Sequence, residues 1–184
     1  MPTAVRPAGP VVHPRDGRPA PAWAVRVAHL IPLAVLPSGL WRIALVAGVP
    51  IGAYEHGAPV RTHGWESVYV VSLTVVSEAL ALLALGLVRP WGEVFPRWLP
   101  LLGGRRVPPS FAVTVATAGA VGVTLVWAYA ARNMLVRDLV VDGDGLGFSP
   151  AGFALLLACY APLLLWGPLL LAVTLAYHRR RCRD

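Results

Sequence analysis

The chain has 184 residues, of which 57% are hydrophobic and only 14% are charged. Soluble domains carry about 25% charged residues, so much of this chain is expected to avoid water. The net charge of +7 could serve a nucleic-acid partner, but the arginines stand at the ends of long apolar runs and not along one polar face. That placement argues against nucleic acid and is typical of the signals that orient membrane proteins.

Residues 1–22 form an N-terminal arm that contains six prolines. Proline lacks the backbone donor that a helix needs, so the arm is predicted to be disordered and to lie in the cytoplasm. It does not match a secretory signal peptide, because the first apolar run starts late and extends too far.

Four apolar runs follow, at about residues 24–52, 67–88, 110–131 and 151–177. A helix needs about 20 apolar residues to cross the hydrocarbon core, and each run is long enough. Helix is the expected form, because lipid provides no hydrogen-bond partners for an open backbone. The sequence thus predicts an all-α membrane protein: a four-transmembrane-helix bundle over residues 23–178, followed by a basic cytoplasmic tail over residues 179–184.

Prolines interrupt the periodic pattern of the first run. Pro32 and Pro37 lie inside it, and Gly39 follows. An internal proline frees a carbonyl group and kinks the helix axis. We therefore expect the first helix to be bent or locally broken around Leu36–Gly39.

Small residues recur every four positions in the third run, at Ala112, Ala116 and Ala120. This spacing lets the backbones of neighbouring helices approach closely. Packing within the bundle explains the pattern more simply than a dedicated dimer face does.

The arginines predict the orientation in the membrane. Only three lie on the predicted outer side: Arg61, Arg132 and Arg137. Twelve lie on the other side, in the arm, the second loop and the tail: Arg6, Arg15, Arg18, Arg26, Arg89, Arg97, Arg105, Arg106, Arg179, Arg180, Arg181 and Arg183. Basic loops stay in the cytoplasm, so both termini are predicted to be cytoplasmic in a multi-pass protein of the bacterial plasma (inner) membrane.

Two charged residues lie deep inside the apolar runs. Arg42 lies ten residues before the outer end of the first run at Gly52, and Glu78 lies eleven residues after the outer end of the second run at Ser67. Antiparallel neighbours would place both side chains at one level, where a lone charge costs about 2.5–3.5 kcal/mol. We therefore predict an Arg42–Glu78 pair inside the bundle, since a guanidinium can bind a carboxylate through two parallel hydrogen bonds.

Three further residues complete this candidate intramembrane site. Tyr160 lies nine residues from the outer end of the fourth run, and Trp41 and Ser77 adjoin the two charged residues in sequence. Such a polar site could bind a substrate head group or relay a proton. The alternative is a pair that only fixes the register of the helices.

The first outer loop carries His56, His63 and Glu66. His63 and Glu66 have the spacing of one helical turn, and such side chains can bind zinc. Histidines in loops are usually only solvated, so we expect no metal site and keep these three residues as weak candidates.

The predicted inner loop interleaves aromatic and cationic residues. Tryptophan favours the membrane interface, and arginine favours anionic head groups. One interpretation is an interfacial anchor. The other is a site for lipid head groups or phosphate, for which the candidates are Arg89, Arg97, Arg105, Arg106, Trp91 and Trp98.

The same loop carries a resemblance to a known family. The stretch Gly86-Leu-Val-Arg-Pro-Trp-Gly-Glu93, with Pro96-Arg-Trp-Leu-Pro100 and Gly103-Gly-Arg-Arg-Val-Pro-Pro109 after it, resembles a family of small uncharacterised integral membrane proteins from actinobacteria. The segment Leu36-Pro-Ser-Gly-Leu-Trp-Arg42 is similar to the same group. The resemblance covers about residues 29–109 and implies a multi-helix plasma-membrane protein, but no catalytic residue.

Three classes of function fit these features. We favour a membrane-embedded binding or accessory protein, because no cofactor motif is visible and Glu78 is the only acid within the four runs, whereas general acid–base catalysis needs matched proton partners. The alternatives are a transporter or channel subunit, with a path lined by Arg42 and Glu78, and a small integral-membrane enzyme acting on a lipid or isoprenoid. The expected partners are anionic lipid head groups at the cytoplasmic face, and further copies of the chain or a larger membrane complex.

Overall fold

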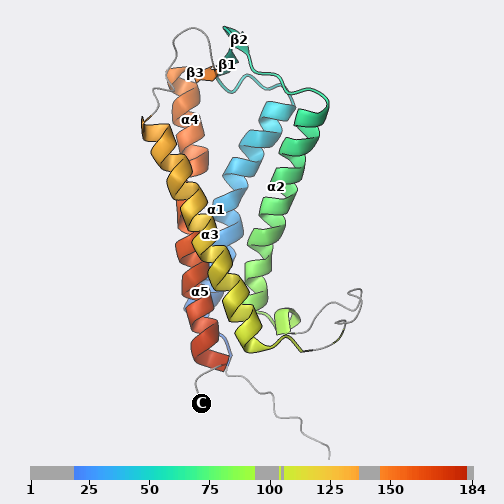
Figure 1. The fold of residues 1–184 in the computed structure, drawn as a ribbon, viewed down its shortest axis with the longest axis vertical. Coiled ribbons are helices and arrows are strands. Elements are labelled where there is room, and N and C mark those ends of the chain that lie inside the picture. The colour runs from blue at the N-terminus through green and yellow to red at the C-terminus, as the bar shows by residue number, and fades with distance from the viewer. Residues whose placement is uncertain (1–18, 94–103, 105, 137–145, 182–184) are drawn as a thin grey trace, which may run out of the picture.

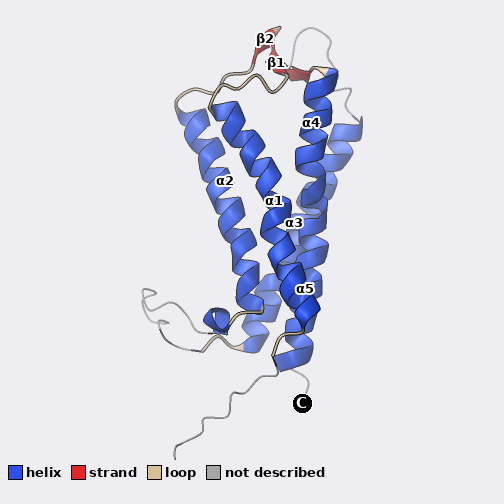
Figure 2. Ribbon diagram, turned by 180° about the vertical axis from the view of Figure 1, so that it is seen from behind, coloured by secondary structure: helices blue, strands red, loops and turns tan. Residues whose placement is uncertain are grey.

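The computed structural model describes residues 19–93, 104, 106–136 and 146–181. In chain order, the elements in these ranges are α1 (Ala22–Val46), β1 (Ala53–Glu55), β2 (Ala58–Pro59), α2 (Trp65–Leu83), η1 (Ala84–Leu87), η2 (Pro90–Glu93), α3 (Pro109–Val136), β3 (Leu146–Phe148), α4 (Pro150–Tyr160), η3 (Ala161–Leu165) and α5 (Trp166–Arg181). The helices lie side by side along the long axis, and the strands lie at one end (Figure 1; Figure 2). We call that end the sheet face, and the opposite end, where α1 begins and α5 ends, the terminal face.

Four helical segments of the described chain are long and apolar enough to cross a membrane: Ala22–Val46, Trp65–Leu87, Pro109–Met134 and Pro150–Arg181. Large aliphatic side chains point away from the bundle on these segments. Leu33, Leu40, Val75 and Leu125 are between 60% and 65% exposed. Such outward-facing residues suit contact with lipid chains. The prediction of four helical segments that are long and apolar enough to span a membrane is thus confirmed.

α1 runs without a break through both of its internal prolines, Pro32 and Pro37. The Ser38 hydroxyl donates to the carbonyl oxygen of Val35 at 2.8 Å in the same segment. The sequence predicts that the first helix is either bent or locally broken around Leu36–Gly39. A local break does not occur there, and a bend of the helix axis stays a prediction.

α1 is shorter than the first apolar run, because it ends at Val46 instead of reaching Gly52. Gly48 has a φ of +75°, which is the left-handed conformation common just after a helix end. The Val49 amide then donates to the carbonyl oxygen of Ala44 at 3.0 Å, which caps the helix. The remaining residues of the run, 47–52, form the loop that leads into strand β1.

The fourth membrane segment is three helical pieces in line and not one α-helix. α4 ends at Tyr160, the short 3-10 helix η3 follows, and α5 starts at Trp166. Pro162 lies at the start of η3. A proline there has no amide hydrogen to give to the preceding turn, so the chain tightens into i to i+3 hydrogen bonds. The break places Tyr160 at the joint between two helices.

A small antiparallel sheet of order β2-β1-β3, which the sequence does not predict, covers the sheet face. Ala53 pairs with Phe148, and Tyr54 pairs with both Gly147 and Pro59. The sheet is tied to α4 by close backbone packing, since a Cβ on Gly52 would lie 2.7 Å from the Cα of Gly152. Position 52 therefore requires glycine, and its φ of +77° adds to that requirement.

The main core joins α1, α2, η1, η3 and α5, with Ile31, Val35, Leu163 and Val173 among its fully buried residues. α3 packs chiefly on α5. At their crossing, Gly167 lies directly against Thr124 and the carbonyl oxygen of Ala120. The predicted close approach of small residues on α3 thus occurs within the bundle.

Candidate functional site

Arg42 is buried in the interior of the bundle, at only 6% exposure. Its Nε donates to the carbonyl oxygen of Ser38 at 3.1 Å, and its Nη2 donates to the Ser38 hydroxyl at 3.0 Å. Both acceptors lie one turn earlier on α1. The charged group is therefore held against its own helix by two charge-assisted hydrogen bonds.

Glu78 faces α1 from the neighbouring helix α2. A Cβ on Gly39 would lie 3.4 Å from Oε1 of Glu78 and 3.1 Å from the Cγ2 of Thr74. The missing side chain at Gly39 is what allows this part of α2 to approach α1. Oε1 of Glu78 is shielded from solvent and has no hydrogen-bond partner among the described residues.

The predicted proximity of Arg42 and Glu78 is present, but their side chains are not joined. Arg42 lies within electrostatic range of both Glu78 and Tyr160. The hydrogen bonds of Arg42 in the described part of the chain go to Ser38. A direct, two-bonded Arg42–Glu78 pair therefore stays a prediction.

Aromatic rings enclose the site on the side of the sheet face. The Tyr160 ring lies edge-on to Trp41, with ring centroids 5.6 Å apart, and 5.9 Å from the ring of Trp127. Trp41 also contacts Phe148 of β3 at 6.5 Å. The Nε1 of Trp41 is buried without an acceptor in the described residues. The site therefore combines a guanidinium, a carboxylate and a phenol within an apolar wall.

Ser77, the remaining predicted member, is occupied elsewhere. Its hydroxyl donates to the carbonyl oxygen of Leu73 at 2.7 Å, one turn earlier on α2. Thr74, which the prediction did not include, lies against Gly39 instead. Its hydroxyl also bonds back along α2, to the carbonyl oxygen of Val70 at 2.9 Å. Helical periodicity explains the difference, because Thr74 and Glu78 are four residues apart and share one face.

The candidate head-group residues lie at the terminal face, as far as the structure describes them. Nη2 of Arg89 lies 3.4 Å from Nε2 of His29 near the start of α1, and Arg106 is exposed. On α5, Nη2 of Arg180 donates to the carbonyl oxygen of Leu87 at 3.2 Å. The other predicted residues, Arg97, Trp98 and Arg105, fall outside the described residues.

Two glycines explain how Trp91 is placed. η2 folds back so closely on η1 that a Cβ on Gly92 would overlap the backbone of Gly86. A Cβ on Gly86 would in turn lie 3.3 Å from the ring of Trp91. Position 92 therefore requires glycine, whereas a side chain at position 86 would only press against the indole of Trp91. These residues therefore build a tight turn that lays the indole of Trp91 beside η1.

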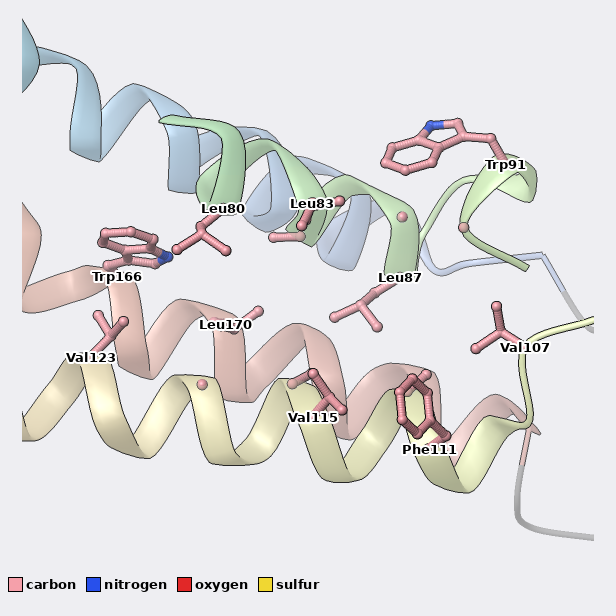
Figure 3. A pocket seen from close by; sticks show the side chains of 16 residues that line it. Leu80, Leu83, Leu87, Trp91, Val107, Phe111, Val115, Val123, Trp166 and Leu170 are labelled. Carbon is pink, nitrogen blue, oxygen red and sulfur yellow. The ribbon is translucent and has the colours of Figure 1, made fainter. Parts of the chain in front are cut away.

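Trp91 also lines an apolar pocket of about 310 Å³ between α2, α3 and α5, which the sequence does not predict. Figure 3 shows Leu83 and Leu87 on one side, Val115 and Leu170 on the other, and Trp166 at the inner end. All the lining residues are aliphatic, aromatic or glycine. No periodic signal in the sequence separates them from ordinary membrane-helix residues.

The three weak metal candidates lie at the sheet face and are all exposed: His56, His63 and Glu66. His56 occupies the turn between β1 and β2 with a φ of +51°. The described residues contain no group of three or more histidine, cysteine or acidic side chains that could hold a metal ion. The structure therefore adds no support for metal at this loop.

Comparisons of the chain with protein-family models, with curated proteins and with solved structures find no match.

Proposed function

We propose that this chain is a membrane-embedded binding or accessory protein, whose intramembrane polar site is formed by Arg42, Glu78 and Tyr160. The site takes a small polar group presented from within the membrane. Ionisable residues inside membrane helices usually mark a path or a binding site, since their insertion is costly. The absence of a second acid near Glu78 in the described bundle disfavours general acid–base chemistry.

The observation that carries this proposal is the buried Oε1 of Glu78. A buried polar atom without a partner costs about 1–3 kcal/mol, and a charged one costs more. Arg42 is close enough to lower that cost electrostatically, but its hydrogen bonds in the described part of the chain go to Ser38. A ligand group that donates a hydrogen bond to Glu78 would complete the site, and Arg42 would favour a ligand that also carries an acceptor.

The orientation is also part of the proposal. The described arginines of the terminal face are Arg26, Arg89, Arg106, Arg179, Arg180 and Arg181, whereas those of the sheet face are Arg61 and Arg132. This asymmetry supports a terminal face in the cytoplasm of a bacterial inner membrane. Anionic lipid head groups at that face, and further copies of the chain or a larger complex, are the proposed partners, and membership of the actinobacterial family is proposed with them.

Cysteine accessibility tests this orientation. Single cysteines at Arg61 and Arg89, in a variant with Cys159 and Cys182 replaced by serine, would be treated with a membrane-impermeant maleimide on intact cells. We expect labelling at position 61 alone. Labelling at position 89 alone would place the terminal face outside and overturn the orientation.

Native mass spectrometry tests the binding site. Wild-type protein released from bacterial membranes is expected to retain a small molecule that Glu78→Gln and Arg42→Gln lose. Ser77→Ala is the matched control, since its hydroxyl bonds only within α2, and it should retain the molecule. Retention that is equal in all four proteins, or absent from the wild type, would reduce Arg42 and Glu78 to a structural role. The same spectra report whether the chain is a monomer.

A further inference from the structure

The pocket between α2, α3 and α5 is about one membrane leaflet deep. Its lining on α3 extends from Phe111 to Val123, a helix rise of about 18 Å. The hydrocarbon core of a bilayer is about 30 Å thick, so the pocket is slightly longer than half of it. The lining runs from Val107 and Trp91 at the terminal face to Trp166 at mid-span (Figure 3).

The volume and lining of the pocket suit one hydrocarbon chain. About 310 Å³ lies at the lower end of the range for small-molecule sites. No polar side chain apart from the indoles lines it, so it offers a chain only dispersion contacts and removal from bulk lipid. Gly119 keeps the α3 wall open, because nothing lies within 4 Å of the position its Cβ would take.

Arginines lie near the end of the pocket at the terminal face. Arg89 lies two residues before Trp91, and Arg106 directly precedes Val107, so both stand beside lining residues. Both are exposed. Arg180 reaches the same end through its hydrogen bond to the carbonyl oxygen of Leu87. A ligand whose chain fills the pocket would therefore place its head among guanidinium groups, which bind phosphate oxygens well.

We propose that this pocket binds one acyl chain of an anionic phospholipid from the leaflet at the terminal face, with the phosphate head held by Arg89 and Arg106. The apolar pocket selects the chain, and the arginines select the charge. Trp91 lies between the two parts, at the level where tryptophan is favoured. This inference rests on the head-group part of the proposed function and is independent of the Arg42–Glu78 site.

Two matched glycines test the chain pocket. Gly119 lines it and Gly122 does not, while both lie on α3 with open space at the Cβ position. Detergent-purified, delipidated protein would be incubated with dioleoyl phosphatidylglycerol, and the retained lipid counted by native mass spectrometry. Gly119→Leu should lose the retained lipid, and Gly122→Leu should match the wild type. Equal retention by both variants would overturn the pocket as the site of the chain.

The head-group contacts are tested with the same assay. Wild-type protein should retain phosphatidylglycerol in preference to phosphatidylcholine of the same chains. Arg89→Gln and Arg106→Gln should each reduce that preference about fivefold, whereas Arg132→Gln at the sheet face should leave it unchanged. Equal retention of the two lipids by the wild type would overturn the charge selection. Sensitivity to Gly119→Leu would then still show a chain site, so the two failures can be told apart.

Discussion

Two regions of this helical bundle differ in the side chains that they enclose: one is polar and the other is apolar. Between α1, α2 and α4, a guanidinium, a carboxylate and a phenol share an enclosed site near mid-span. Between α2, α3 and α5, an apolar pocket extends from mid-span to the terminal face. The polar site is closely packed, although Oε1 of Glu78 and Nε1 of Trp41 have no hydrogen-bond partner among the described residues. The apolar pocket holds open space, and its aliphatic lining needs no hydrogen-bond partner.

Glycine has opposite uses in the two regions. Gly39 on α1 lets Glu78 and Thr74 of α2 pack against it, so its lack of a side chain allows a close helix contact. Gly119 produces space, because no neighbour comes within 4 Å of its Cβ position. A small residue in a membrane helix therefore marks either a close crossing or an open groove, and only the structure distinguishes the two.

The largest effect is expected from Arg42→Leu, which tests whether the polar site is a coupled unit. The change removes both hydrogen bonds to Ser38 and the cation beside Glu78, so the free energy of unfolding should fall by about 3 kcal/mol. Glu78→Gln alone should change it by less than about 1 kcal/mol, because Oε1 has no partner to lose among the described residues. SDS titration in mixed micelles measures both values.

The double variant decides whether the two residues form a pair. If Arg42 and Glu78 are coupled, Arg42→Leu with Glu78→Gln should be more stable than Arg42→Leu alone, by about 1 kcal/mol. Simple addition of the two single effects would show that no pair exists and that each residue acts only through its own helix.

The next largest effect is expected from Gly167→Ala, which tests the close crossing of α3 and α5. A Cβ at Gly167 would lie 2.7 Å from the carbonyl oxygen of Ala120, a backbone atom that cannot turn aside. We expect a loss of about 2 kcal/mol in the same titration. Gly122→Ala is the control and should cause no loss, since that position is open. An equal response would mean that α3 and α5 are not tightly packed in solution.

Much of the polar region could be predicted from the sequence, because charge inside an apolar run is rare. Arg42 and Glu78 stood out for that reason, and counting residues from the loop placed them at one level. The identity of their hydrogen-bond partners could not be predicted. Ser38 lies one turn away on the same helix, so its oxygens compete with the Glu78 carboxylate as acceptors for the Arg42 guanidinium.

The apolar region could not be predicted, since its residues differ from lipid-facing ones only in their neighbours. The small-residue pattern on α3 correctly indicated close helix packing at Ala120, but gave no sign of the open space at Gly119. The break at Pro162 and the sheet at the sheet face were also missed. A single proline in a long apolar run, and strands of two or three residues, give weak signals against the strong one for a membrane helix.

A smaller effect is expected from Gly39→Ala, which tests how tightly α1 and α2 enclose Glu78. The added Cβ would lie 3.1 Å from Cγ2 of Thr74, whose hydroxyl is bound to the carbonyl oxygen of Val70. We expect a loss of about 1 kcal/mol. Thr74→Ser keeps the hydroxyl and removes the methyl group, so it should restore stability when combined with Gly39→Ala. Failure to restore would show that the carboxylate, and not the methyl group, limits the space.

The smallest effect is expected from Trp166→Phe, at the inner end of the apolar pocket. Trp166 is 5% exposed, and its Nε1 has no acceptor in the described chain. Phenylalanine keeps an aromatic ring in the lining of the pocket and removes the unpaired donor, so the two effects should nearly cancel and the free energy of unfolding should change by less than about 1 kcal/mol. Trp166→Ala, in contrast, should cost about 3–5 kcal/mol because it leaves a cavity. If Trp166→Phe alone costs more than about 2 kcal/mol, the indole has an acceptor in the membrane. The pocket would then hold a polar group at mid-span as well as a hydrocarbon chain, and the contrast between the two regions of the bundle would no longer hold.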